Sequence, residues 1–288
     1  MLFKLIKYEW RAMMRSLLPV YIAALALSVI IGLGSELDIF TRLSAMPGLG
    51  FLEVVLTLLQ VVLVIAYVVI IVALFVISTI VSVQRFYKGL LRDEGYLMFT
   101  LPVKVWELTL SKAIVSFLAG FISIIVAIFA IGLLSAVDLF EFILAIFQIP
   151  GQLIGAVNEA LLRGTITPAD LTNLTIFAIE FILMAIISAF AGIYQFYAAM
   201  ALGQMSRKHK VLFSVLWYIG INIIASIVFY AALFLGAGTV SIMGAFATAH
   251  PMIAVHMVVG AMFIYCVINL AAFILVTNVV LKQRLNLE

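Results

Sequence analysis

Residues 52–83 read LEVVLTLLQVVLVIAYVVIIVALFVISTIVSV, and Glu53 is the only charged residue among them. A helix that crosses a bilayer needs about 20 apolar residues, because each residue adds about 1.5 Å along the axis and the hydrocarbon layer is about 30 Å thick. This stretch is longer than that, and it lacks the alternation of apolar and polar residues that marks a barrel strand. Apolar runs of helix length recur along the chain. The sequence therefore predicts an all-α polytopic membrane protein.

Composition supports the same fold class. Of the 288 residues, 67% are hydrophobic and 10% are charged, and the mean hydropathy is +1.33, which lies outside the range of soluble domains. Cys266 is the only cysteine, so neither an intramolecular disulfide nor a site with several thiolate ligands is possible within one chain. The basic residues of the N-terminus are spread along it rather than preceding an apolar run, so we expect no cleavable signal peptide.

We expect a single transmembrane domain, 1–288, with six spans. The spans cover about 17–34, 52–83, 110–136, 172–204, 211–236 and 252–281. The amphipathic segment 1–16 is expected to lie in the membrane interface. The apolar parts of 137–171 are too short or too interrupted to span, so this segment is expected outside the cell, with Thr167 capping a helix that has Pro168 at its first position.

The basic residues predict the orientation of the spans. With six spans, fourteen of the 16 Lys and Arg residues fall on one side of the membrane, and only Arg42 and Arg163 fall on the other. Positive charge concentrates on the cytoplasmic side of membrane proteins. Both termini are therefore expected in the cytoplasm.

The longest cytoplasmic connection, residues 84–112, reads QRFYKGLLRDEGYLMFTLPVKVWELTLSK. It places Tyr96, Leu97, Met98, Phe99 and Leu101 beside charged residues, and Pro102 stops any helix there. We expect a short helix flanked by Gly95 and Pro102 and a second one that begins near Val103. Exposed aromatic residues and methionine with a charged rim are typical of docking surfaces. The alternative is a turn whose apolar residues enter the lipid headgroup layer.

This segment resembles the connection between the second and third spans of type-2 ABC transporter permeases. The matching residues are Arg92, Glu94, Gly95, Leu97, Leu101, Pro102, Leu108, Leu110 and Lys112. The string DEGYLMFTLP and the N-terminus are similar to a Firmicute subgroup of that family, although the Gly95–Pro102 interval is slightly shorter than the commonest family pattern. Agreement in topology covers the whole chain, whereas agreement residue by residue is confined to these two segments.

The resemblance implies that the loop is a coupling helix gripped by a separate ATPase subunit. Its contact residues would be Arg92, Asp93, Glu94, Gly95, Tyr96, Leu97, Met98, Phe99, Leu101 and Pro102. This chain would bind no cofactor itself, with ATP and Mg²⁺ held by the ATPase. A second permease copy or a paralogous permease would complete the transporter in a bacterial plasma membrane. A hairpin over 237–250 that dips into the outer leaflet is also implied.

Polar residues in the spans are the candidates for a substrate path. They are Glu53, Gln60, Glu180, Gln195, Asn222 and Asn269. Acids inside a membrane are costly and commonly functional, but both acids lie near the outer interface, where a solvated residue on a projecting helix is the alternative. The amides are more often partners in hydrogen bonds between helices. For His256 we expect a hydrogen bond rather than a metal.

The leading hypothesis is the permease subunit of an ABC exporter whose cargo is amphipathic or hydrophobic. The sequence contains no Gly-x-x-x-x-Gly-Lys-Ser/Thr motif, zinc-protease motif or nucleophile elbow, so we expect no enzymatic site of its own. Nucleic-acid binding is not expected, because the basic residues follow the membrane face. A secondary transporter or channel, and a scaffold or sensor that docks a cytoplasmic partner, remain alternatives.

Overall fold

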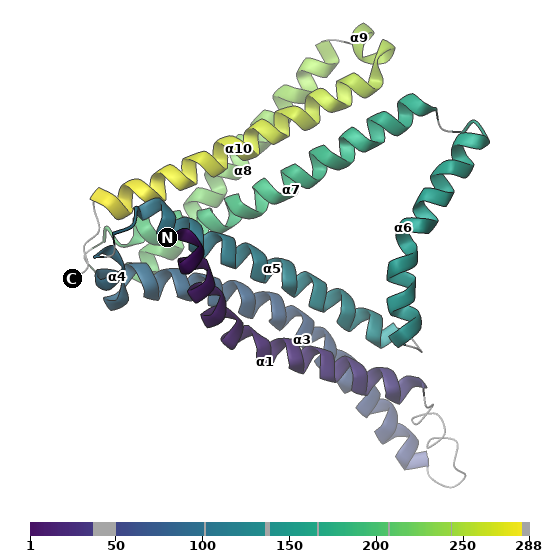
Figure 1. The fold of residues 1–288 in the computed structure, drawn as a ribbon, viewed down its shortest axis with the longest axis horizontal. Coiled ribbons are helices and arrows are strands. Elements are labelled where there is room, and N and C mark those ends of the chain that lie inside the picture. The colour runs from purple at the N-terminus through teal and green to yellow at the C-terminus, as the bar shows by residue number, and fades with distance from the viewer. Residues whose placement is uncertain are drawn as a thin grey trace. The chain divides into compact units, whose positions relative to one another are not determined.

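The computed structural model describes residues 1–36, 50–100, 102–135, 139–165, 167–206, 208–242 and 244–283. Within these ranges the regular structure is entirely helical, which confirms the all-α fold class. The helices are α1 (Leu2–Glu36), α3 (Gly50–Leu91), α4 (Asp93–Phe99), α5 (Val105–Ser135), α6 (Leu139–Leu162), α7 (Pro168–Gly203), α8 (Lys210–Ile242), α9 (Gly244–Ala249) and α10 (Pro251–Gln283) (Figure 1).

Six of these helices are long and apolar enough to cross a membrane, as the sequence predicts. The candidate spans are Leu2–Gly32, Val54–Leu91, Val105–Leu133, Pro168–Gly203, Lys210–Leu235 and Met252–Lys282. They belong to α1, α3, α5, α7, α8 and α10. By the length and composition of its helices, the chain is a multi-pass membrane protein.

The sequence predicts a boundary near residue 17 between an interfacial segment and the first span, but the helix is not interrupted there. α1 runs without interruption from Leu2 to Glu36 and has Pro19 inside it. The helix continues through Pro19, and its Lys, Arg, Leu and Met residues have good helix propensity.

The bounds of other spans also differ from expectation. α3 continues past residue 83 to Leu91, so the basic residues that follow the apolar run lie on its last turns. α5 starts at Val105 and absorbs the second short helix expected near Val103. α8 ends at Ile242 rather than near residue 236, and the short α9 follows it. In α3 and α5 hydropathy did not mark the ends that carry charged residues, and in α8 it did not mark the end that contains Ala, Gly and Ser.

The segment expected outside the cell contains a helix of 24 residues, α6. α6 continues through Pro150 to Leu162, and it is not among the candidate spans of the described residues. The predicted start of α7 is confirmed. The Thr167 hydroxyl accepts a hydrogen bond from the Asp170 amide at 3.2 Å, and the Asp170 carboxylate accepts one from the Thr167 amide at 3.0 Å, with Pro168 in the first turn.

The chain divides into two compact units. Unit 1 comprises Met1–Ile6, Val83–Phe117 and Ala160–Glu288, and unit 2 comprises Lys7–Ser82 and Leu118–Glu159. Within unit 2, α1 is tied to α5 by the Tyr21 hydroxyl, which donates to the Ala119 carbonyl at 3.2 Å and lies 2.9 Å from the Ser123 hydroxyl. Within unit 1, α7, α8 and α10 lie side by side (Figure 1).

Candidate functional site

The core of unit 1 is a cluster of buried side chains at the ends of four helices, which we call the helix-end cluster. Its buried members are Phe86, Leu90, Leu91, Leu108, Ala113, Tyr194, Tyr197, Met200 and Leu281. The Phe86 and Tyr197 rings stack with centroids 3.9 Å apart, and the Tyr197 hydroxyl lies 3.1 Å from that of Ser116. The end of α3, the start of α5 and the ends of α7 and α10 are thereby fixed to one another.

The short helix α4 is attached to this cluster. Gly95 lies in its first turn, rather than ahead of it as expected, and a Cβ there would meet the Leu90 carbonyl oxygen at 2.5 Å. Only glycine permits α4 to approach the end of α3 this closely. Met98 and Phe99 are half-buried and pack against the cluster. Leu97, in contrast, is 68% exposed.

The expected contact residues of α4 therefore divide into two groups. Met98 and Phe99 hold the helix in place, whereas Leu97 and the exposed residues Arg92 and Pro102 at either side of α4 face outward. The Arg92 guanidinium carbon lies 5.2 Å from the centroid of the Tyr87 ring, a cation–π distance. The side chains of Asp93, Glu94 and Tyr96, and the whole of Leu101, lie outside the described residues.

The start of α5 is fastened by polar contacts. The Thr109 hydroxyl donates to the Asn278 side chain of α10 at 3.2 Å. The Lys112 ammonium donates to the Arg85 carbonyl of α3 at 3.4 Å, and Lys112 is 5% exposed. From the sequence, Lys112 is expected among the basic residues of the cytoplasmic side. The structure places its side chain between helices. The start of α5 is thus tied to both α3 and α10.

The turn between α7 and α8 packs tightly. A Cβ at Gly203 would meet the Ser214 backbone nitrogen at 2.6 Å, so α8 lies directly against the end of α7 at Ser214. His209, just before α8, has a φ of 57° in the left-handed region. Leu5 of α1 also packs against the helix-end cluster. Basic segments that are far apart in the sequence thus meet at one end of unit 1.

Glu180 has a partner that the sequence did not indicate. The His256 Nδ1 atom of α10 lies 3.0 Å from a Glu180 carboxylate oxygen of α7, and the two side chains are 20% and 30% exposed, respectively. The Phe177 ring stacks on the imidazole with centroids 4.0 Å apart. The sequence places each residue near the same end of its span. Whether the two side chains meet depends on how each helix is rotated about its own axis, which the sequence does not show.

The structure shows no contact between this pair and the other polar candidates whose side chains it describes, Gln195, Asn222 and Asn269. The Asn222 and Asn269 side-chain amides donate to the Tyr218 and Tyr265 carbonyls, at 2.9 and 3.0 Å. These bonds stay within one helix, so the expectation of bonds between helices is wrong for them. Gln195 lies fifteen residues from Glu180 on α7, about 22 Å along the axis. The side chains of Glu53 and Gln60 lie outside the described residues.

Among the described residues, no three His, Cys, Asp or Glu side chains gather in a way that could hold a metal ion. None of the protein families, curated proteins or solved structures with which we compared the chain matches it. The function is therefore argued from the geometry of unit 1 and from the residues of α4.

Proposed function

We propose that the chain is the transmembrane permease subunit of an ATP-driven exporter that resembles the type-2 ABC permeases. The observation that carries this proposal is α4. It is a two-turn helix whose one face is fixed to the helix-end cluster while Leu97 remains exposed. An exposed leucine on a helix that is fixed in place between basic residues is typical of a surface that a partner protein covers.

In this proposal α4 acts as the coupling helix. A partner that moves α4 displaces the ends of α3, α5, α7 and α10, because the helix-end cluster joins them. Packed clusters change arrangement as units rather than deform gradually. Movement driven by ATP at the partner would therefore be converted into rearrangement of the spans.

The complex contains further chains. Two ATPase subunits would supply ATP and Mg²⁺, and a second permease copy or a paralogous permease would complete the path for the cargo. Both termini would lie in the cytoplasm of a bacterial cell. The 35-residue α1 is about 52 Å long, more than a bilayer needs, so one end of it would extend beyond the hydrocarbon layer.

The cargo would be amphipathic or hydrophobic, such as a peptide, a lipid or a drug-like molecule. The described parts of the spans carry few charges, and their exposed surface is largely Leu, Ile, Val and Phe. A strongly charged molecule would find little compensation for its lost hydration along such a path.

One observation favours a secondary transporter as a second candidate. The Glu180–His256 pair is a titratable pair within two candidate spans, and such groups mark proton and ion pathways in transporters. An ion-coupled transporter requires no ATPase partner, so the experiment below separates the two candidates.

The test is co-purification of the tagged chain in mild detergent from its native cells, followed by mass spectrometry and an ATP-turnover assay. We expect a co-purifying chain with a Walker motif and ATP hydrolysis. Leu97→Ala should lower its recovery about tenfold, since buried anchors at interfaces contribute 1–2 kcal/mol or more. Recovery of the chain alone, silent toward ATP, would contradict the proposal and favour a secondary transporter or a scaffold.

Leu174→Ala is the matched control. Leu174 is 58% exposed, like Leu97, but it lies near the opposite end of α7, where a cytoplasmic partner does not reach. Recovery should stay at the level of the unchanged chain. An equal loss from both variants would indicate a general effect of exposed leucines rather than docking at α4. Phe99→Ala is a poorer probe, because Phe99 also holds α4 in place.

A further inference from the structure

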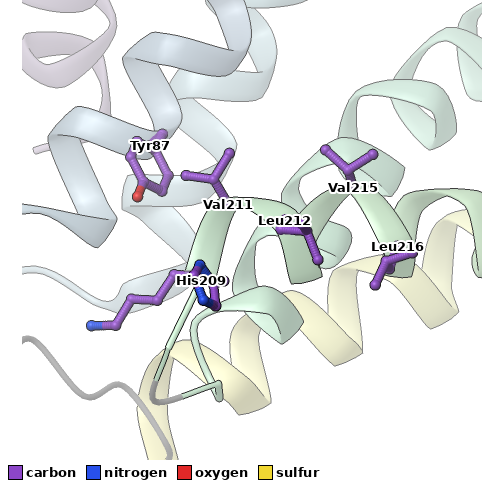
Figure 2. A pocket seen from close by; sticks show the side chains of 7 residues that line it. Tyr87, His209, Val211, Leu212, Val215 and Leu216 are labelled. Atoms are coloured by element: carbon purple, nitrogen blue, oxygen red, sulfur yellow. The ribbon is translucent and has the colours of Figure 1, made fainter.

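A cavity of about 690 Å³ lies between α3 and the start of α8. Its lining residues are Tyr87, His209, Lys210, Val211, Leu212, Val215 and Leu216. Figure 2 shows Tyr87 of α3 facing Val211, with His209 at one end of the row and Leu216 at the other. Each of the four aliphatic side chains is more than half exposed. We call this cavity the α3–α8 pocket.

The pocket has an apolar wall and a cationic end. Lys210 and His209 lie at the start of α8, and exposed Lys208 precedes them. The Arg92 guanidinium stands 5.2 Å from the Tyr87 ring, which forms the opposite wall. None of the seven lining residues is acidic. A ligand that fits must therefore combine an anionic group with an apolar portion.

The position of the pocket along α8 indicates which part of the ligand lies at the membrane surface and which lies deeper. The candidate span in α8 begins at Lys210, so the basic residues lie where the chain enters the membrane. Val211, Leu212, Val215 and Leu216 occupy the first two turns inside. An anionic group at the interface would thus continue into an apolar portion that follows the helix axis. Basic pockets between spans bind the headgroups of anionic lipids in this way.

We propose that the α3–α8 pocket binds an anionic phospholipid. The phosphate lies beside Lys210 and His209, and an acyl chain lies along the aliphatic row of α8. Free phosphate would leave the aliphatic row uncovered. A lipid contacts both the basic end of the pocket and the aliphatic row. The proposal requires that α8 span the membrane, but it does not depend on an ATPase partner or on export.

The experiment is native mass spectrometry of the purified full-length chain, mixed with equal amounts of dioleoyl phosphatidylglycerol and dioleoyl phosphatidylcholine. We expect about fivefold higher retention of phosphatidylglycerol, and Lys210→Gln should reduce this preference about fivefold. Val215→Trp keeps every charge but places a bulky ring across the aliphatic row of α8, so it should also reduce retention of phosphatidylglycerol. Val215 is more than half exposed and Lys210 is half-buried, so neither change removes a fully buried side chain.

Lys104→Gln is the matched control, because Lys104 is exposed near the start of α5 and does not line the pocket. Its preference for phosphatidylglycerol should equal that of the unchanged chain. Equal retention of both lipids would overturn the proposal, as would an equal effect of Lys104→Gln and Lys210→Gln. Displacement of the lipid by millimolar glycerol phosphate would also overturn it, since the site would then bind the phosphate group alone.

Discussion

Gly95 is the residue at which α4 touches α3, and its lack of a side chain is what permits the contact. A Cβ there would lie 2.5 Å from the Leu90 carbonyl oxygen and 2.8 Å from the carbonyl carbon. Both are backbone atoms, which cannot move aside as the tip of a flexible side chain can. The sequence singled out Gly95 as the flank of a short helix, but the close approach depends on how α3 ends.

Gly95→Ala should therefore detach α4 from the helix-end cluster. We expect a loss of about 1–3 kcal/mol in the free energy of unfolding, as for other overpacked sites, with faster proteolysis around residue 95. Thermal unfolding in detergent and limited proteolysis measure the two effects. In Gly120→Ala, the matched control within α5, the new Cβ would meet nothing within 4 Å. That change should be neutral or slightly stabilising; similar losses from both variants would contradict the account of Gly95.

The Glu180–His256 pair is the second residue-scale feature that can be tested. A double-mutant cycle with Glu180→Gln and His256→Gln should give a coupling energy of about 0.5–2 kcal/mol, because the side chains are in direct contact. Unfolding of the four proteins in detergent measures it. The cycle of Glu180→Gln with Asn222→Ala should be additive, since Asn222 bonds within its own helix. Additivity in both cycles would show that the pair does not join α7 to α10.

At the scale of elements, the sequence predicted a helix boundary correctly where the boundary depends on neighbouring residues alone. The start of α7 is the best example, because the Thr167 cap, Pro168 and the Asp170 carboxylate all lie within four consecutive residues. The extent of α3 and α8 was underestimated, because α3 continues through basic residues and α8 through small residues such as Ala, Gly and Ser. Hydropathy contains no signal for such extensions.

Thr167→Ala should loosen the first turn of α7 by about 0.5–2 kcal/mol, the usual cost of losing a helix cap. Hydrogen exchange at the Asp170 and Leu171 amides should become faster by a corresponding factor, while exchange near Tyr194 stays unchanged. Thr172→Ala serves as control, because its hydroxyl donates to the Pro168 carbonyl of its own helix rather than capping it. Equal acceleration in both variants would argue against a specific role for the cap.

At the scale of the whole molecule, the expected orientation depends on the count of six spans, because the count decides which connections share a side of the membrane. This orientation can be tested by labelling. In a Cys266→Ala background, Asp170→Cys should react with an impermeant thiol reagent added outside intact cells, and Lys208→Cys should react only after the cells are opened. Cys266 accepts one weak hydrogen bond from Ser188, so its loss should be tolerated. The reverse pattern of labelling would place α4 outside the cell and end the proposal of an ATPase partner.

The sequence by itself determined the fold class, the number of spans, the start of α7 and the segment in which α4 lies. Each of these features depends on hydropathy, composition or a few neighbouring residues, and all three can be read from the sequence. Only the tertiary structure decided that Leu97 faces outward while Phe99 faces inward, that Lys112 is buried, and that His256 meets Glu180. These features depend on the rotation of each helix and on its register against its neighbours. Nearly every face of a membrane helix is apolar, so the sequence pattern does not mark which face meets protein and which meets lipid.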